Sequence, residues 1–313
     1  MTESDTLTLP APAKLNLFLH ITGQKDNGYH QLQTIFQLLD FGDELTLRKL
    51  PASASSIAPL ELESKLKGVA DADNIVIQAA ERLRRYSGCQ YGAQIKLLKR
   101  TPMGGGMGGG SSDAASTLLG LNQLWSLGLS LDDLASIGVE LGADVPIFIY
   151  GENSFAEGIG EQLKPINLPD QWFVVVKPPI EVTTATIFAH SQLTRDSQAI
   201  RIPAFFDPST NAKDNAVQQQ RDFLAQHSLK NDCEAVVRAE YPQIDRALEQ
   251  LARFGNARLT GTGSCIFAGF SGKEQAEATL QAVSADTDNL CWIAKSSTRS
   301  TAHSALAQFQ RGS

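Results

Sequence analysis

The chain has 313 residues, of which 42% are hydrophobic and 19% charged, so its composition suits a globular protein of two domains or one large domain. Its net charge of −7 argues against a protein that binds nucleic acid along a broad cationic surface, and no apolar run approaches the length of a membrane span. The four cysteines are scattered with no C-x-x-C pair and the N-terminus lacks the pattern of a signal peptide, which together predict a cytoplasmic protein without a disulfide scaffold or zinc site.

The first predicted element is a strand at residues 13–21, where apolar and polar side chains alternate as they do in a half-buried strand. Lys14, Asn16 and His20 would then share one face of that strand. A solvent-exposed strand lysine is the simplest interpretation of Lys14 from the pattern alone. Residues 1–9 are expected to form a loose lead-in or an edge strand.

A polar turn at 23–30 follows the strand and carries Tyr29. A tyrosine ring in a loop can stack on a nucleotide base or belong to the edge of the core, and the sequence leaves both interpretations open. Residues 36–47 are expected to form two strands joined by a turn at 41–44. Residues 50–59 are rich in Ala, Ser and Pro and are expected to form a surface loop.

An amphipathic helix is predicted to begin at Asn74, because this capping residue precedes an amphipathic run. The same side chain could instead contact a nucleotide, so capping and binding both remain open for it. Residues 93–98 alternate as a strand and lead towards a glycine-rich segment.

The glycine-rich segment is the most informative part of the sequence. Six glycines leave the backbone N–H groups free to turn inward around an anion. Apolar residues at helical spacing follow, with Ser111 and Ser112 as the expected N-cap residues, and a helix N-terminus favours a phosphate. The residues expected to hold the phosphates of a nucleotide are Pro102, Met103, Gly104, Gly105, Gly106, Met107, Gly108, Gly109, Gly110, Ser111 and Ser112.

Other interpretations of this segment can be weighed against a phosphate-binding loop. A P-loop would need Lys and Ser or Thr directly after the last glycine, and neither is present. Gly104, Gly106 and Gly109 fit the dinucleotide pattern G-x-G-x-x-G, but the residues 99–102 separate them from the strand, so the tight strand-to-helix turn is missing. A flexible linker seldom lies between a strand and a well-capped helix. A phosphate-binding loop of another type is therefore favoured.

Helices and short strands follow the glycine-rich segment. A helix is predicted at 131–141 with Ser130 as its N-cap, and Asp144 lies in a segment with an ordinary turn signature. Small residues at 259–270 would let the backbone approach a ligand or the first glycine loop. The other expected elements are a strand at 147–150, a hairpin at 151–160, a strand at 172–176, a helix starting at 183–188, a long loop at 191–220, helices beginning at 231 and 241, and an unassigned tail at 296–313.

The segment Pro102–Ser112 resembles the central motif of the GHMP kinase superfamily, with Met107 where leucine is usual. Residues 12–17, Pro-Ala-Lys-Leu-Asn-Leu, look like the first motif of that superfamily. Residues 259–265, Leu-Thr-Gly-Thr-Gly-Ser-Cys, look like the third. Three motifs in the family's order are more specific than any one of them.

Two further segments are similar to those of one branch of the superfamily, whose members phosphorylate an alcohol linked to cytidine diphosphate. These segments are Gly-Tyr-His at 28–30 and Gly-Ala-Asp-Val-Pro at 142–146. The five matching segments cover most of the chain from residue 10 to about residue 270. The resemblance implies an α+β fold with a domain at 1–167, a second at 168–313, and the active site in the cleft between them.

The resemblance also implies a kinase that uses ATP and Mg²⁺. Lys14 and Asp144 would be its catalytic residues, and Asn74 would lie near the nucleotide. Asp144 would accept the proton of the attacking hydroxyl, while Lys14 would keep that carboxylate ionised and neutralise charge on the moving phosphoryl group.

Substrate recognition is expected from two facing aromatic rings and the polar groups beside them. The implied substrate-binding residues are Asn16, Tyr29, His30, Thr184 and Phe188. Tyr29 and Phe188 would enclose the base of a small molecule that contains a cytidine diphosphate moiety. A GHMP kinase with a different small substrate and a non-catalytic sensor on the same fold remain alternatives. We expect no nucleic-acid or membrane partner, and a monomer or weak homodimer.

Overall fold

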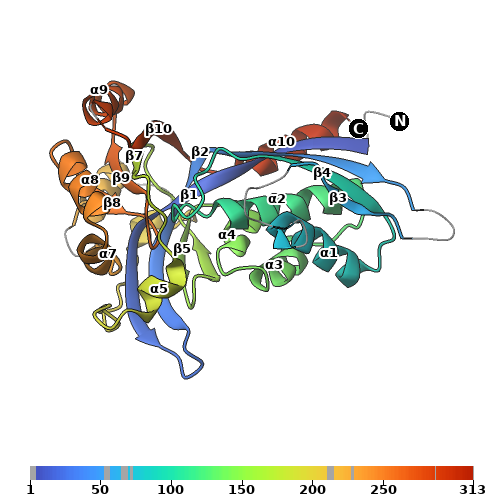
Figure 1. Cartoon of the computed structure of the whole chain (residues 1–313), viewed down its shortest axis with the longest axis horizontal. Coiled ribbons are helices and arrows are strands. Elements are labelled where there is room, and N and C mark those ends of the chain that lie inside the picture. The colour runs from blue at the N-terminus through green and yellow to red at the C-terminus, as the bar shows by residue number, and fades with distance from the viewer. Residues whose placement is uncertain are drawn as a thin grey trace.

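The computed structural model describes residues 5–52, 57–64, 70, 73–209, 215–226, 229–285 and 287–312. It contains both helices and strands, as an α+β fold requires (Figure 1). The strands are β1 (Thr6–Gln24), β2 (His30–Leu50), β3 (Leu60–Leu62), β4 (Gly92–Leu98), β5 (Ser154–Glu157), β6 (Gln162–Pro165), β7 (Trp172–Lys177), β8 (Arg258–Leu259), β9 (Ile266–Phe270) and β10 (Leu290–Ser297). The helices are α1 (Ile75–Ser87), α2 (Gly109–Leu124), α3 (Leu131–Val139), α4 (Val145–Tyr150), α5 (Thr184–Ala189), η3 (Ala204–Phe206), α6 (Ala216–Leu224), α7 (Glu234–Glu240), α8 (Pro242–Ala252), α9 (Lys273–Ser284) and α10 (Thr301–Gly312).

Within the described residues, ten strands form one connected sheet in the order β3-β4-β2-β10-β7-β9-β8, with β1 and β5 paired to β2 and β6 paired to β5. The antiparallel pair β1 and β2 runs through most of the length of the molecule (Figure 1). Strand β10 joins the two parts of the sheet, because it pairs with β2 at one end and with β7 along the rest.

Two predictions about the first strands are corrected. The residues from Ala11 to Ile21 are all buried, so β1 is covered on both faces instead of being half-buried. The expected turn at 41–44 does not exist, because β2 continues through it. A Cβ atom on Gly42 would lie 2.1 Å from the carbonyl oxygen of Ala11, so this glycine serves the close approach of β1 and not a turn.

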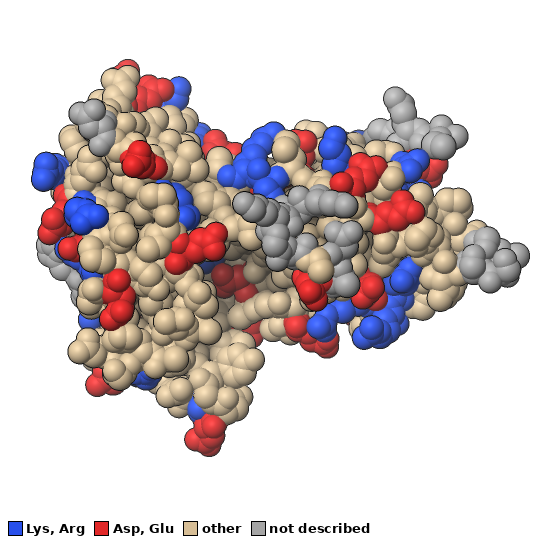
Figure 2. Space-filling model, viewed as in Figure 1, with Lys and Arg blue, Asp and Glu red and all other residues tan. Residues whose placement is uncertain are grey.

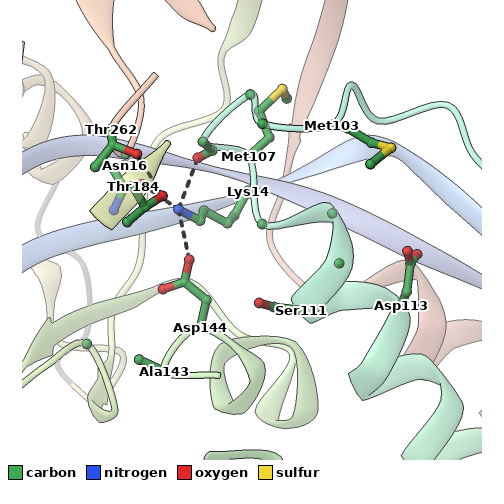
Figure 3. A pocket seen from close by; sticks show the side chains of 18 of the residues that line it. Lys14, Asn16, Met103, Met107, Ser111, Asp113, Ala143, Asp144, Thr184 and Thr262 are labelled. Atoms are coloured by element: carbon green, nitrogen blue, oxygen red, sulfur yellow. Dashed lines mark hydrogen bonds and ion pairs between the residues drawn. The ribbon is translucent and has the colours of Figure 1, made fainter. Parts of the chain in front are cut away.

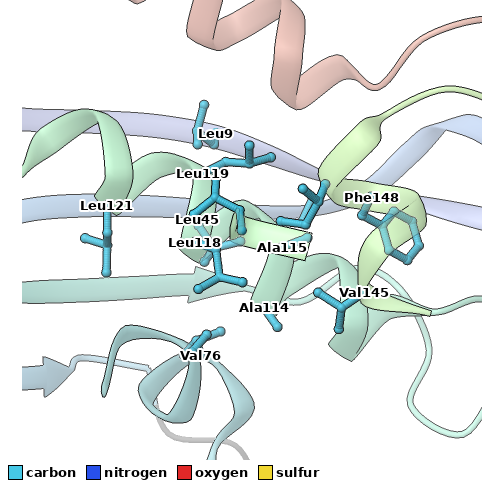
Figure 4. Packing of buried hydrophobic residues seen from close by; sticks show 14 of the residues in the cluster. Leu9, Leu45, Val76, Ala114, Ala115, Leu118, Leu119, Leu121, Val145 and Phe148 are labelled. Atoms are coloured by element: carbon cyan, nitrogen blue, oxygen red, sulfur yellow. The ribbon is translucent and has the colours of Figure 1, made fainter. Parts of the chain in front are cut away.

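Helices α1 to α4 pack on one part of the sheet and share its largest apolar cluster (Figure 4). Leu9 and Leu45 from the strands meet Val76, Leu118 and Phe148 from the helices. The packing is close, since a Cβ atom on Gly120 of α2 would lie 2.3 Å from a methyl carbon of Leu47. Burial of such a cluster removes apolar surface from water and holds α2 in a fixed position on the sheet.

The predicted strand at 147–150 is wrong, because these residues form most of helix α4. Its apolar run is compatible with a buried helix as well as with a buried strand. Pro146 in the first turn and Gly151, which has a left-handed conformation at the C-cap, favour the helix. The predicted hairpin at 151–160 lies further along the chain, where β5 pairs with β6. Ser130 does cap α3, in a capping box with Asp133, and residues 93–98, 172–176 and 183–188 have the predicted structure.

The C-terminal part of the chain packs around β7 and β9 in two further apolar clusters, and β1 contributes residues to both. The predicted long loop at 191–220 contains η3 and the start of α6, and its residues 210–214 lie outside the described residues, as do 53–56 of the predicted surface loop. The unassigned tail forms the end of β10 and helix α10, which returns to lie beside β1 and packs Leu306 and Phe309 on the first cluster (Figure 1). None of the described helices combines the length and the apolar character needed to cross a membrane.

Candidate active site

The glycine-rich segment forms a loop whose conformation depends on glycine. Gly104, Gly106 and Gly108 have φ angles of 62°, 72° and 72°, in the left-handed region that other residues rarely adopt. Helix α2 begins at Gly109 with Gly108 as its N-cap, so the predicted caps Ser111 and Ser112 lie inside the first turn. The left-handed residue sets the start of the helix earlier than a serine cap would.

This helix start exposes an anion-binding end. The N–H group of Ser112 donates to the carbonyl of Gly108 at 2.9 Å and is the first N–H of the intrahelical ladder. The N–H groups of Gly109, Gly110 and Ser111 precede that ladder, so an intrahelical acceptor is missing for each of them. Together with the positive end of the helix dipole, these N–H groups have the chemistry that suits a phosphate.

A second glycine loop between β8 and β9 contacts the first one through its backbone. The N–H groups of Ser264 and Cys265 donate to the carbonyls of Gly104 and Gly105 at 3.0 and 3.2 Å. The hydroxyl of Thr260 donates to the carbonyl of Gly106 at 3.2 Å. The prediction that small residues at 259–270 let the backbone approach the first glycine loop is therefore confirmed.

The two loops border a cavity of about 660 Å³. Figure 2 shows the surface hollowed where the broad and narrow parts of the molecule meet. Most of the predicted site residues line this cavity, and Ser112, Tyr29 and His30 do not. The predicted residues that line it are Lys14, Asn16, Asn74, Pro102, Met103, Gly104, Gly105, Gly106, Met107, Gly108, Gly109, Gly110, Ser111, Asp144, Thr184 and Phe188.

Lys14 and Asp144 meet in this cavity (Figure 3). The Nζ atom of Lys14 lies 3.2 Å from Oδ2 of Asp144, and it donates to Oδ1 of Asn16 at 2.5 Å and to the carbonyl of Gly106 at 3.2 Å. The Lys14 side chain is 3% exposed and that of Asp144 33% exposed, so the exposed strand lysine is excluded. The three acceptors fix a buried positive charge, and the carboxylate stays accessible from the cavity.

Asn74 serves as the N-cap of α1, since its Oδ1 atom accepts from the N–H of Val76 at 3.1 Å. Its buried Nδ2 atom has no hydrogen-bond partner within the described part of the chain. Because Asn74 also lines the cavity, its amide can donate to a bound molecule while its oxygen caps the helix. Capping and binding are thus compatible functions of one side chain.

A buried charge cluster behind the glycine loop was missed from the sequence. Lys99 donates to Asp43 and, at 2.7 Å, to Asp113 in the first turns of α2. The other oxygen of Asp43 accepts from the N–H groups of Arg100 and Thr101 at 2.5 and 2.6 Å. The cluster therefore ties together β2, the start of the loop and the helix that follows it.

Burial determines the protonation behaviour of this cluster. It raises the pKa of Asp113 to about 8, although the ammonium of Lys99 opposes the shift. Burial disfavours the charge of Lys99 as well, but the carboxylates of Asp113 and Asp43 outweigh it and raise the pKa of that lysine. Two carboxylates share one ammonium here, so one proton can remain on the acidic pair at a pH where an exposed aspartate would have lost it. Sequence spacing carries no signal for this contact between residues far apart in the chain.

The candidate substrate-binding residues occupy two places. The hydroxyls of Thr184 and Thr262 lie 3.0 Å apart at the cavity (Figure 3). The ring of His30 lies against that of Phe188, with 5.0 Å between centroids, and its Nε2 atom accepts from Nε of Arg195 at 3.0 Å. Burial and the nearby guanidinium lower the pKa of His30.

The predicted aromatic pair is not formed as expected. Tyr29 is 59% exposed on the turn between β1 and β2 and is absent from the cavity lining, so the structure brings His30 and not Tyr29 against Phe188. Arg195, which also donates to the carbonyl of Phe188 at 2.9 Å, was not expected from the sequence. An arginine in a polar, aperiodic segment gives no pattern from which to predict such a contact.

Comparison with known proteins gives the family. The family model of the GHMP kinases N terminal domain matches residues 74–152. The family model of the GHMP kinases C terminal domain matches residues 211–289. A 4-diphosphocytidyl-2-C-methyl-D-erythritol kinase of Alcanivorax borkumensis is 49% identical over 277 residues, which are 88% of this chain and 86% of that protein. The protein of that name in Pseudomonas putida strain W619 is 45% identical over 300 residues, or 96% of each chain.

Solved structures agree with this assignment. A crystal structure of 4-(cytidine 5'-diphospho)-2C-methyl-D-erythritol kinase, 27% identical, superposes with a TM-score of 0.74 over 93% of this chain and 99% of that one. A homoserine kinase from Cytophaga hutchinsonii, at 17% identity, superposes with a TM-score of 0.68 over 96% and 97% of the two chains and so shares the fold. The chain belongs to the GHMP kinases and, among them, to the family of the 4-diphosphocytidyl-2-C-methyl-D-erythritol kinases.

Proposed function

We propose that the protein transfers the γ-phosphoryl group of ATP to the 2-hydroxyl of 4-diphosphocytidyl-2-C-methyl-D-erythritol, in the non-mevalonate (methylerythritol phosphate) route to isoprenoid precursors. The names of the relatives at 44–49% identity support the substrate. One observation supports the reaction type: the Nζ atom of Lys14 and the Oδ2 atom of Asp144 lie 3.2 Å apart in the cavity that the glycine loop borders. A phosphate cradle beside a fixed lysine and an accessible carboxylate suits phosphoryl transfer to a hydroxyl.

The glycine loop would hold the triphosphate through main-chain groups. The N–H groups of Gly109, Gly110 and Ser111 at the start of α2 are available for phosphate oxygens. The surroundings of Gly110 are open, since a Cβ atom on this residue would meet nothing nearer than Ile75 at 4.0 Å. The Nδ2 atom of Asn74 would add a donor at the nucleotide.

The residues of the cavity also fit Mg²⁺ that is bound as a complex with ATP. The described residues contain no group of three or more His, Cys, Asp or Glu side chains placed to hold a metal ion. Mg²⁺ bound together with ATP would take most of its ligands from phosphate oxygens and water. The hydroxyl of Ser111 lines the cavity and would be the protein's ligand. When bound, the ion would neutralise charge on the phosphate oxygens.

Lys14 and Asp144 would have different roles in the reaction. Asp144 would accept the proton of the attacking hydroxyl, because its carboxylate is accessible from the cavity. Lys14 would hold that carboxylate in place through their ion pair and stabilise negative charge on the transferred group. Asn16, which accepts a hydrogen bond from Lys14, would contact the substrate near the reacting end.

The cytidine diphosphate moiety would be held on the other side of the cavity. Phe188 and Thr184 line it, and His30 lies against Phe188. Tyr29 would complete the aromatic pair when the exposed turn that carries it moves over the base.

We also propose that the enzyme works in the cytoplasm as a monomer or weak homodimer, with domains at 1–167 and 168–313. Helix α10 would cross that division, since it packs on the first apolar cluster.

A panel of substrates tests the proposal. ADP release with ATP and Mg²⁺ is measured on the cytidyl methylerythritol compound, mevalonate, homoserine and galactose, and turnover is expected on the first alone. Turnover only on another compound of the panel would reject the proposed substrate, and ATP binding without turnover on any compound would favour the non-catalytic sensor.

In the same assay Asp144→Asn should lower kcat strongly while ATP affinity stays near normal. Full turnover in this variant would reject Asp144 as the base.

A further inference from the structure

A second cavity lies away from the candidate active site, at the broad end of the molecule where β7, β8 and β9 lie (Figure 1). Its volume is about 200 Å³, and it shares no lining residue with the larger cavity. The lining residues are Leu17, Gln171, Phe173, Arg221, Leu224, Ala225, Asn256, Arg258, Phe267, Gly269, Phe270 and Ser271. They include two arginines and neither aspartate nor glutamate.

The two guanidinium groups differ in how they are satisfied. Arg258 is 9% exposed and donates to the carbonyls of Leu17 and Leu224 at 2.7 and 2.6 Å, which hold it in place. Arg221 has a buried Nε atom with no hydrogen-bond partner, and its side chain forms no hydrogen bond or ion pair in the part of the chain that the structure describes. A buried donor without an acceptor costs free energy that a bound acceptor would recover.

The carboxylate whose charge acts on Arg258 lies outside the cavity lining. Glu234 interacts with Arg258 through its charge, but it is outside the lining and already accepts from the N–H of Leu259 at 3.1 Å and lies 3.9 Å from Arg238. Two like charges facing one small cavity repel each other unless an anion lies between them. The planar fork of a guanidinium matches the oxygens of a phosphate group.

The rest of the cavity suits an apolar body attached to that anion. Phe173 and Phe267 pack edge to face in its wall, with 5.8 Å between ring centroids, and Phe270 also lines it; the three side chains are 1%, 3% and 5% exposed, so only a small part of each ring reaches the cavity. Asn256 and Ser271 are exposed at its rim, so the cavity is reached from solvent through polar groups. We propose that this cavity binds a small organic phosphate, with the phosphate on Arg221 and Arg258 and the carbon body on the phenylalanine rings.

Calorimetry with phenyl phosphate tests this site in the full chain, and variants that leave the proposed active site unchanged separate binding in this cavity from binding at the glycine loop. Phenyl phosphate is expected to bind more tightly than inorganic phosphate, which lacks the apolar body. Arg221→Gln should weaken the binding about tenfold or more, the value of a lost hydrogen bond to a charged group. Arg246→Gln removes the same charge from an exposed position of α8 outside the cavity, and should leave the affinity unchanged.

A second variant keeps the test independent of any effect of Arg221 on folding. Asn256→Asp places a carboxylate at the rim with almost no change of volume, and should weaken phenyl phosphate binding by repulsion. Basal turnover without phenyl phosphate should match the wild type in all three variants, which shows that they are folded. The proposal is rejected if phenyl phosphate does not bind under these conditions, or if it binds the wild type, Arg221→Gln and Asn256→Asp equally.

Discussion

Replacing Gly106 by alanine should separate the two glycine loops and disable the active site. A Cβ atom at this position would lie 2.1 Å from the carbonyl oxygen of Thr260, whereas Cβ contacts under 3.0 Å essentially do not occur. The neighbour is backbone of the second loop, so the two loops must move apart by about 0.9 Å to restore that limit. The φ angle of 72° adds about 1–2 kcal/mol of strain for any residue with a Cβ atom.

The displacement would reach Lys14, one of the two proposed catalytic residues. The carbonyl of Gly106 accepts from Nζ of Lys14 and from the hydroxyl of Thr260, both at 3.2 Å. Moving this carbonyl takes away one of the three acceptors that position the ammonium. A misplacement of about 1 Å can lower turnover by about 10²-fold, and we expect a loss of that order in kcat/KM for Gly106→Ala.

Gly128→Ala is the matched control, because Gly128 has a φ angle of 67° and a Cβ atom there would meet nothing within 4 Å. It carries the backbone strain without the collision. Urea unfolding should show a loss of about 1–2 kcal/mol for Gly128→Ala and at least as much for Gly106→Ala. Steady-state ADP release should be impaired only in Gly106→Ala. Equal stability and equal kinetics in the two variants would refute the argument from the loop contact.

Three further predictions concern the buried charge cluster and the substrate side. Lys99→Met should cost about 3–5 kcal/mol of unfolding free energy, because it removes the only cation that pairs with the buried Asp43 and Asp113 within the described residues, whereas Lys96→Met, at an exposed position of β4 just before Lys99, should stay within about 0.5 kcal/mol. Because burial raises the pKa of Asp113 to about 8, the native chain keeps a proton that the unfolded chain releases, so stability should fall as the pH rises from about 4 to about 8. Asp113→Asn should flatten that part of the profile, and parallel profiles of variant and wild type would contradict the shift. Tyr29→Ala and Phe188→Ala should each raise KM for the cytidyl substrate roughly tenfold through lost stacking, with KM for ATP unchanged; unchanged values for both substrates would argue against the aromatic contact.

Local patterns predicted the secondary structure wherever a pattern has one interpretation. The helix that Asn74 caps, the capping box of Ser130 and the strand at 93–98 all depend on neighbours a few residues away. The errors arose where tertiary contacts decide between equal alternatives. Gly42 was assigned to a turn, but the approach of Ala11 explains it. Residues 147–150 form a helix, and because residues 147–149 are fully buried, their apolar run has no periodicity that would distinguish a helix from a strand.

The candidate site divides in the same way. The glycine loop is one continuous segment, so its proposed role in phosphate binding can be predicted from the sequence before any fold is known. The Lys14–Asp144 pair came from the resemblance, and the structure brings the two side chains together. Lys99, Asp43 and Arg195 were missed because each acts through a contact with a residue far away in the chain. Motifs mark groups that must be adjacent in sequence, whereas supporting contacts need only be adjacent in space.

The position of Lys14 explains how distant segments are held in register before any nucleotide binds. Its ammonium is buried, so each of its protons needs an acceptor, and the three acceptors come from β1, the glycine loop and the residue before α4. Any relative shift of these segments would leave a buried charge poorly paired. The cost of that mismatch keeps the loop, the carboxylate and the ammonium in one arrangement. The Lys14 ammonium, which would stabilise the transferred phosphoryl group, also fixes the positions of the groups around it. These charges are therefore already oriented when the substrates bind, and the reaction does not require their reorganisation.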